Sequence, residues 1–214
     1  MKYDSINLNS PYNLFTGDKP KKRTIQKSED VSEKNIGILS EALDGATDFR
    51  DAKRIIGIAA GNDYIEKINE TTYKTGKYVL KTFLRVSGEG QAKSLEKLTK
   101  QNISIAPKLV YTRNYGDYTI IITQIDGLEE GGLVPFSQGY KLLSDGAKQD
   151  AYRDVQKVLK MGYVNQAMLY GDSNWYITPK SKKIMVVDWK PLRSVREGES
   201  IELLNDMYKT IFNK

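Results

Sequence analysis

The segment between residues 170 and 189 constrains the fold more than any other part of the chain. Two apolar runs in it are separated by a short basic stretch, a pattern that predicts two strands joined by a turn. Asp172 and Asn174 precede the first strand, and Asp188 closes the second. Such a hairpin would gather two carboxylates and an amide at one end, and an enzyme that holds Mg²⁺ and ATP needs these groups together.

The residue types that the chain lacks exclude several classes of enzyme. Among its 214 residues there is no cysteine, so disulfides, thiol catalysis and thiolate metal sites are excluded. There is also no histidine, which excludes Ser-His hydrolases, zinc hydrolases and His-based phosphotransfer. Acid–base chemistry must therefore come from Asp, Glu, Lys or Tyr.

The charge and hydropathy patterns limit the kinds of partner that we expect. The net charge of +6 fits a solvated, Lys-rich surface, but it would also attract ATP, an acidic protein or nucleic acid. No RNA-binding or helix-turn-helix pattern supports nucleic acid. No apolar run reaches about 18 residues, so we expect no membrane span, and the N-terminus lacks the apolar core of a secretory signal peptide.

Periodicity divides the chain into a polar tail and two halves. Residues 1–34 show no sustained period and are expected to be flexible, whereas 35–126 and 127–214 form a first and a smaller second half-domain. The predicted helices lie at about 33–43, 89–101, 147–161 and 200–212. Besides the hairpin, strands are predicted at 78–84, 109–111 and 118–123, with a strand, a Gly/Ala turn and another strand within 53–68.

Small residues mark a candidate phosphate-binding turn in the first half. Gly57, Ala59 and Gly61 lie in the turn predicted within 53–68, where the lack of bulky side chains would let backbone N–H groups approach an anion. The second glycine of a typical phosphate loop is replaced by Ala59. A plain hairpin turn explains the same residues equally well.

A lysine and a glutamate in the first half form a second candidate pair. Lys81 lies in the predicted strand 78–84, which resembles the Val-Ala-Ile-Lys strand of protein kinases; that resemblance implies contact with nucleotide phosphates, and the alternative is an outward-facing lysine on an alternating strand. Glu96 lies near the middle of the next helix, where the same resemblance implies a glutamate that orients the lysine. The lysines around Glu96 also fit an ordinary surface ion pair, and Glu89 is the competing candidate.

The second half carries the most specific set of groups. Asp172 follows a predicted helix by about ten residues and precedes a strand, a position that resembles that of a kinase catalytic loop. A carboxylate there would accept a hydroxyl proton and orient the nucleophile. Asn174 and Asp188 offer hard oxygen ligands for Mg²⁺. Each residue alone is also explained by turn chemistry, which favours Asp and Asn, but their order and spacing together favour a site.

Taken together, these motifs resemble the protein-kinase-like superfamily. Val187-Asp188-Trp189 is similar to the Ile-Asp-Trp of aminoglycoside and small-molecule kinases, and the short Asp172-x-Asn174 loop resembles that of the minimal type III effector kinases that bacteria inject into host cells. The resemblance covers about residues 53–212. It implies a two-lobe, α+β, kinase-like fold with an abbreviated C-lobe, and ATP and Mg²⁺ as cofactors.

The chain also departs from the kinase pattern. Only 26 residues follow Asp188, so no long activation segment fits, and the usual peptide-docking platform is missing. Lys190 replaces the flexible glycine that kinases keep two residues after the metal-binding Asp, which argues against in/out switching of Asp188. Substrate choice must therefore use another surface.

The resemblance implies phosphoryl transfer to a hydroxyl of a protein substrate, with Ser or Thr expected more than Tyr. One effector kinase of this kind acts on a host chaperone, so a chaperone is one candidate substrate, and the expected locations are the bacterial cytoplasm before secretion and the host cytosol after it. A pseudokinase-like nucleotide- or protein-binding module, a small-molecule kinase or adenylyl transferase, and a basic nucleic-acid-binding domain stay open as alternatives.

Overall fold

The protein folds into two compact units of mixed helix and strand, so the predicted α+β class is confirmed. Unit 1 holds the chain up to Arg85 together with residues 111–122, and unit 2 holds residues 86–110 and the chain from Thr123 onward. The sequence had placed the boundary between the halves after residue 126. The computed structural model describes residues 28–128, 132–165, 168, 174–178, 181–187, 189–196 and 198–212.

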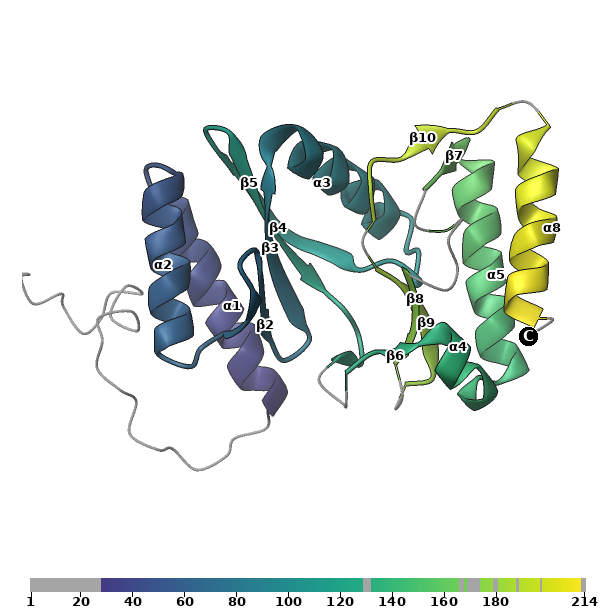
Figure 1. Cartoon of the computed structure of the whole chain (residues 1–214), viewed down its shortest axis with the longest axis horizontal. Helices are drawn as coiled ribbons and strands as arrows, with labels where there is room; N and C mark the ends of the chain where they lie inside the picture. Colours follow the sequence, from purple (N-terminus) through teal and green to yellow (C-terminus); the bar gives the residue numbers. More distant parts are fainter. Residues whose placement is uncertain are drawn as a thin grey trace, which may run out of the picture. The chain divides into compact units, whose positions relative to one another are not determined.

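Unit 1 consists of two helices and most of a five-stranded sheet (Figure 1). The helices are α1 (Ser28–Gly45) and α2 (Phe49–Gly61). The strands are β1 (Glu66–Asn69), β2 (Thr72–Thr75), β3 (Tyr78–Leu84), β4 (Lys108–Tyr115) and β5 (Tyr118–Gln124). They lie in the order β1-β2-β3-β5-β4, and β2 is antiparallel to both β1 and β3.

An apolar core joins α1 and α2 to the sheet. The helix predicted at 33–43 is confirmed within the longer α1, and the predicted stripe of Ile36, Leu39 and Leu43 is buried. Figure 1 shows α1 and α2 side by side next to the strands. The core residues come from both helices and from the sheet: Ile36, Leu39, Ala42, Leu43, Ala46, Ala52, Ile55, Ile56, Ala59, Ile65, Tyr73, Tyr78, Leu80, Tyr115, Ile120 and Ile122.

In its described residues, unit 2 combines three longer helices, two short helical turns and two small sheets, one of which contains the predicted hairpin. Its helices are α3 (Arg85–Lys100), α4 (Phe136–Gly139), the 3-10 turn η3 (Tyr140–Leu142), α5 (Asp145–Lys160) and α8 (Glu199–Phe212). Its strands are β6 (Val134–Pro135), β7 (Tyr163–Val164), β8 (Trp175–Thr178), β9 (Lys183–Val186) and β10 (Arg193–Ser194). The strands form the sheets β6-β8-β9 and β10-β7.

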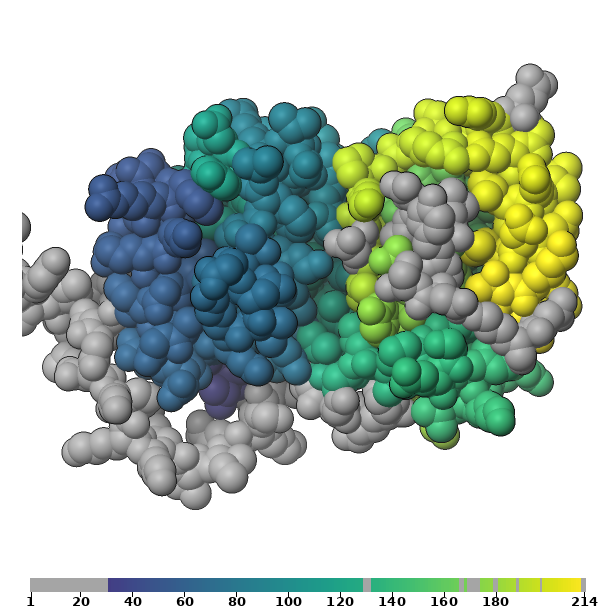
Figure 2. Space-filling view, in the orientation of Figure 1, coloured from purple at the N-terminus to yellow at the C-terminus, as the bar shows by residue number. Residues whose placement is uncertain are grey.

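Two of the predicted helices, α5 and α8, pack against each other in unit 2. Ser144 caps α5, because its hydroxyl accepts a hydrogen bond from the N–H of Ala147 at 3.2 Å. Aromatic rings join the two helices, with Tyr152 edge-on to Tyr208 at 5.6 Å between ring centroids. Figure 2 shows α8 at the surface, where Ile201 is 70% exposed. Both helices agree with the sequence prediction.

Candidate functional site

The hairpin that the sequence predicted near the end of the chain is confirmed as β8 and β9. The strands are antiparallel, with Trp175 opposite Val186 and Thr178 opposite Lys183. Lys182 in the turn has a φ of +49°, and its N–H donates to the carbonyl of Thr178 at 2.7 Å. The side chain of Thr178 closes the same end by accepting from the N–H of Lys183 at 3.2 Å. The hairpin is therefore fixed at its turn by backbone and side-chain bonds together.

At its open end the hairpin brings Asn174 to the residue before Asp188. The N–H of Val187 donates to the carbonyl of Asn174 at 2.9 Å, so the two chain segments lie side by side there. Asp172 and Asp188 themselves lie outside the described residues. The buried ring of Trp189 donates to the carbonyl of Val186 at 2.6 Å, which fixes the chain on the far side of Asp188 as well.

The segment after Trp189 is held by two buried polar side chains. Asn165 is fully buried, and its amide donates to the carbonyl of Lys190. The hydroxyl of Ser94, on α3, accepts from the N–H of Leu192 at 2.8 Å and donates to the carbonyl of Gly90 at 2.8 Å. Sequence reasoning did not single out Asn165, because no local pattern separates it from an ordinary loop asparagine.

A close approach also ties the first half of α3 to this segment. A Cβ atom at Gly90 would lie 2.6 Å from Cγ of Pro191, so only glycine fits there without a shift of the proline ring. On the other side of the hairpin, the N–H of Val186 donates to the carbonyl of Ile105 at 2.7 Å. The chain on either side of Asp188 is thus anchored to α3 and to the loop that follows it.

The two glutamate candidates on α3 differ in their surroundings. Glu96 is exposed and pairs with Lys100 at 2.7 Å, and this hydrogen bond lowers the pKa of the Glu96 carboxyl. That is the surface ion pair which the sequence left open as an alternative for Glu96. Glu89 is half-buried in the turn of α3 that contains Gly90, next to the anchored segment.

The lysine candidate lies on a confirmed strand. In β3, Tyr78 and Leu80 are buried in the core of unit 1, while the alternating residues Val79 and Lys81 are half-buried on the other face. Lys81 lies opposite Thr72 of β2. The side chain of Lys81 is therefore directed away from the core formed with α1 and α2.

The predicted glycine turn at 57–63 is wrong, because Gly57, Ala59 and Gly61 all belong to helix α2. Ala59 is fully buried in the core of unit 1, whereas Gly57 and Gly61 are exposed. The missed signals are the buried spacing Ala52, Ile55, Ile56, Ala59 and the N-cap at residue 48, whose side chain accepts from the N–H of residue 51. These residues thus do not form the loop that phosphate binding requires.

The connection between β1 and β2 also differs from a phosphate-binding loop. It consists of Glu70 and Thr71 and contains no glycine. The carboxylate of Glu70 pairs with Lys67 at 2.7 Å, and this hydrogen bond lowers the pKa of Glu70. A carboxylate at this turn would repel a phosphate.

Comparison with known proteins finds likenesses among solved structures only. No protein-family model and no curated protein matches the chain. Among solved structures, the chain is similar to the protein kinase PK-1 of the Cydia pomonella granulovirus, with a TM-score of 0.48 and 16% sequence identity. The likeness covers 76% of this chain and 74% of the viral chain. Within the described residues, no helix is long and apolar enough to cross a membrane.

Proposed function

We propose that the protein transfers the γ-phosphoryl group of ATP, with Mg²⁺, to a hydroxyl group of a protein substrate. The observation that carries this proposal is the hydrogen bond from the N–H of Val187 to the carbonyl of Asn174. It sets Asn174 beside the residue that precedes Asp188, and Asp172 is two residues before Asn174 in the chain. Phosphoryl transfer depends mainly on positioning and on neutralising charge, and in our proposal Asp172, Asn174 and Asp188 supply the groups for both.

The oxygen donors at this end of the hairpin suit Mg²⁺. Asn174 is half-buried and offers an amide oxygen, and Asp188 follows the paired Val187 directly. Carboxylate and amide oxygens are ligands that Mg²⁺ accepts. We assign Asn174 and Asp188 to hold the ion, which when bound would neutralise charge on the phosphates.

The remaining roles fall to three side chains. Asp172 would accept the proton of the acceptor hydroxyl and orient its oxygen. Lys81 would bind the phosphates of ATP as a positive charge, and an acidic partner on α3 would orient it. We assign the orienting role to Glu89 in place of Glu96, because Glu96 is exposed and already paired with Lys100.

The substrate class rests on the resemblance to minimal effector kinases. On that basis we propose a Ser or Thr hydroxyl rather than a Tyr hydroxyl, and a host protein such as a chaperone as the acceptor. The protein would be made in a bacterial cytoplasm and act in the host cytosol. Lys190 and Leu192, shortly after Asp188, are anchored by Asn165 and Ser94, which favours a site without a switching activation segment.

The test is transfer of label from ATP to the protein itself and to a eukaryotic lysate. Parallel reactions would contain γ-labelled or α-labelled ATP with Mg²⁺, and Asp172→Ala would serve as the control variant. The proposal predicts label from the γ position only, and loss of that label in Asp172→Ala. Label from the α position alone would instead indicate adenylyl transfer. No label from either position with bound ATP would contradict phosphoryl transfer.

A second candidate function, a nucleotide- or protein-binding module without turnover, is favoured by the β1–β2 connection. Glu70 stands in that turn, where a phosphate loop would need small residues and backbone N–H donors. Under this alternative, ATP binding measured by calorimetry would persist while transfer is absent. Glu70→Gly would then strengthen nucleotide binding without creating activity.

A further inference from the structure

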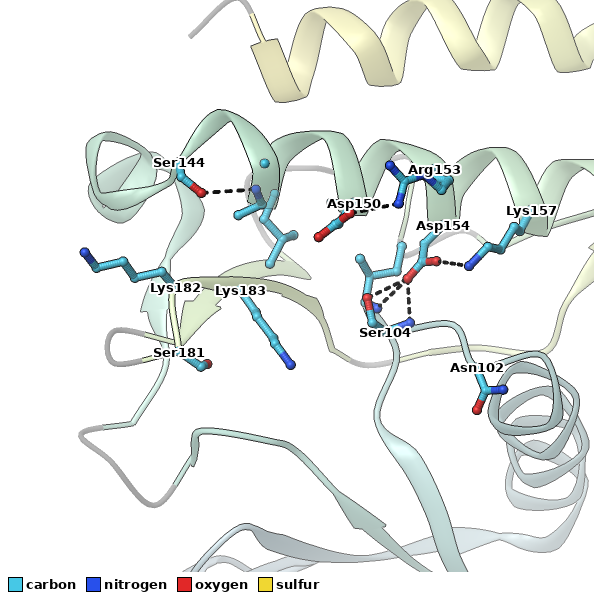
Figure 3. A pocket seen from close by; sticks show the side chains of 15 residues that line it. Asn102, Ser104, Ser144, Asp150, Arg153, Asp154, Lys157, Ser181, Lys182 and Lys183 are labelled. Carbon is cyan, nitrogen blue, oxygen red and sulfur yellow. Dashed lines mark hydrogen bonds and ion pairs between the residues drawn. The ribbon is translucent and has the colours of Figure 1, made fainter.

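Unit 2 contains an open pocket of about 680 Å³ at the turn end of the hairpin, opposite to the end that holds Asn174. The two ends of the hairpin are about 13 Å apart along the strands. Figure 3 shows the pocket between α5, the loop that contains Asn102 and Ser104, and the turn that contains Ser181, Lys182 and Lys183. It is therefore a separate site from the one proposed for phosphoryl transfer.

Positive charge lines this pocket on two sides. Arg153 and Lys157 come from α5, and Lys182 and Lys183 come from the turn between β8 and β9. All four residues are exposed. The attraction that these cations offer to an anionic ligand depends on how each of them is paired.

The two carboxylates of the pocket are already engaged. Asp154 is buried, and one of its oxygens accepts from the N–H and the hydroxyl of Ser104 at 2.5 and 2.7 Å. Its other oxygen accepts from Lys157 at 2.9 Å. Asp150 pairs with Arg153 at 2.9 Å. These carboxylates fix the wall of the pocket and cancel the charge of two of its cations.

The two lysines of the turn carry the unbalanced charge. Within the described part of the chain, neither Lys182 nor Lys183 forms an ion pair or a side-chain hydrogen bond. The positive charge of Lys183 lowers the pKa of Asp126, but this carboxylate already pairs with Lys108 at 3.1 Å. Burial raises the pKa of Asp126, but hydrogen bonds from Gln124 and Lys108 and the nearby lysine charges hold it below its usual value. A ligand anion would therefore find Lys182 and Lys183 available.

We propose that this pocket binds an acidic segment of a partner polypeptide. A single phosphate would need donors that converge on one point, whereas the side chains of Lys182 and Lys183 extend in different directions from the turn (Figure 3), as a run of Asp or Glu side chains would require. None of the described lining residues is aromatic, so the pocket lacks the stacking surface on which single-stranded nucleic acid relies. This proposal does not depend on catalysis, because the pocket lies at the other end of the hairpin.

The test uses the full-length protein and a fluorescently labelled oligoglutamate peptide, with binding followed by anisotropy in the absence of ATP. Lys182→Glu/Lys183→Glu should weaken binding by about tenfold, because two attractions become repulsions. The matched control is Lys93→Glu/Lys141→Glu, which makes the same change in net charge at exposed lysines outside the pocket. The control should bind the peptide as the parent does, whereas an equal loss in both variants would overturn the proposal.

Two further arms keep the test decisive. Lys182→Gln/Lys183→Gln removes the two charges without reversing them, so it should weaken peptide binding less than the double glutamate variant does. The glutamine variant also provides a test if the double glutamate variant does not fold. In competition, unlabelled oligoglutamate should displace the probe. If inorganic phosphate or single-stranded oligothymidine displaced it as well at the same concentration, the assignment to an acidic polypeptide would be wrong. Phosphoryl transfer to a substrate without acidic segments should be unchanged in the lysine variants, which separates this proposal from the proposed activity.

Discussion

The interiors of the two units differ in kind. Unit 1 is built around a continuous apolar core shared by α1, α2 and the sheet. Among the described residues, and leaving the aromatic side chains aside, its buried polar side chains are Ser32 and Thr119, whereas unit 2 buries five: Gln91, Ser94, Asp154, Asn165 and Thr178. Buried polar groups are costly unless bonded, and when bonded they fix one geometry more specifically than apolar contacts do.

The positions of these polar groups in unit 2 show what they fix. Ser94 and Asn165 bond to the backbone after Asp188, Asp154 bonds to the loop before Ile105, and Thr178 closes the turn of the hairpin. All four therefore hold the loops around β8 and β9 in place. A reacting site needs such support, because small displacements of its groups cost activity. The apolar core of unit 1 therefore packs helices on a sheet, while the buried polar side chains of unit 2 fix the positions of loops.

The largest effect on stability is expected at Asp154. Asp154→Ala would remove a buried carboxylate that accepts from Ser104 and Ile105, leaving their N–H groups without this partner. We expect a loss of about 3 kcal/mol in the free energy of unfolding, measured with urea. The control is Asp150→Ala, four residues earlier on α5, which breaks only an exposed pair with Arg153 and should cost less than about 1 kcal/mol. Equal losses would mean that the buried hydrogen bonds of Asp154 contribute no more to stability than an exposed ion pair does.

A smaller effect is expected at the polar rim of unit 1. The buried hydroxyl of Tyr115 donates to the carbonyl of Leu43 at 2.6 Å, close to the C-terminal end of α1. Tyr115→Phe should lower the free energy of unfolding by about 1 kcal/mol, because it removes this bond. Tyr118→Phe is the matched control: its ring stacks on Phe49 at 3.9 Å, and its hydroxyl makes no hydrogen bond within the described residues. If Tyr115→Phe lowered the free energy of unfolding as much as Asp154→Ala, the buried polar groups of unit 2 would be no more important for stability than those of unit 1.

Helix α2 offers a test in the opposite direction. Gly57 lies in the interior of α2, is exposed, and has no atom within 4 Å of an added Cβ. Gly57→Ala should therefore raise the free energy of unfolding by about 0.5–1 kcal/mol. Gly116→Ala is the contrasting variant, because Gly116 has a φ of +57° in the β4–β5 turn, and it should destabilise the protein by about 1 kcal/mol. The stability of both variants would be measured by thermal unfolding. A lower stability of Gly57→Ala than of the parent would argue against a helix at this position.

The smallest effect is a pH dependence at the start of α8. Hydrogen bonds from Arg193 and from the N–H of Arg196 lower the pKa of Glu199 to about 2, from an ordinary value of 4.5. A carboxyl with a lowered pKa in the folded state stabilises the protein above its unfolded pKa, and this contribution is lost as the pH falls through the folded pKa. The midpoint of thermal unfolding should therefore be higher for the parent than for Glu199→Gln at about pH 6, with a smaller difference at about pH 3.

Glu202→Gln provides the control for that pH dependence. Glu202 lies in the same first turn of α8 and forms no ion pair within the described residues. Its substitution should leave the difference from the parent nearly constant with pH. If Glu199→Gln behaved in the same way, the pair with Arg193 would make no measurable contribution.

The parts of the fold that could be predicted are those with a clear period. The hairpin follows from two apolar runs around a basic turn, and α5 and α8 follow from apolar stripes at helical spacing. The segment 53–68 was misread because Ile55, Ile56 and Ile58 favour strands and Gly57 favours a turn. Tertiary packing of the Ala52–Ala59 face on α1 and the sheet overrides these local preferences.

Those features of the candidate site that depend on distant contacts could not be predicted. The choice between Glu89 and Glu96 depends on Gly90 meeting Pro191, residues that no local pattern connects. The basic pocket likewise joins Arg153 and Lys157 of α5 to the turn at Lys182. In each case the sequence shows the charges, but only the packing of the chain shows which of them share a site.

The most direct test of the proposed function compares phosphoryl transfer by two variants that differ in the unit they alter. Asp188→Asn alters the anchored end of the hairpin in unit 2, and Gly57→Ala/Gly61→Ala alters helix α2 in unit 1. We predict that Asp188→Asn lowers the rate of transfer by about a thousandfold or more, whereas the double alanine variant retains the rate of the parent. Loss of transfer in the alanine variant, with activity retained in Asp188→Asn, would contradict the assignment of the chemistry to the hairpin.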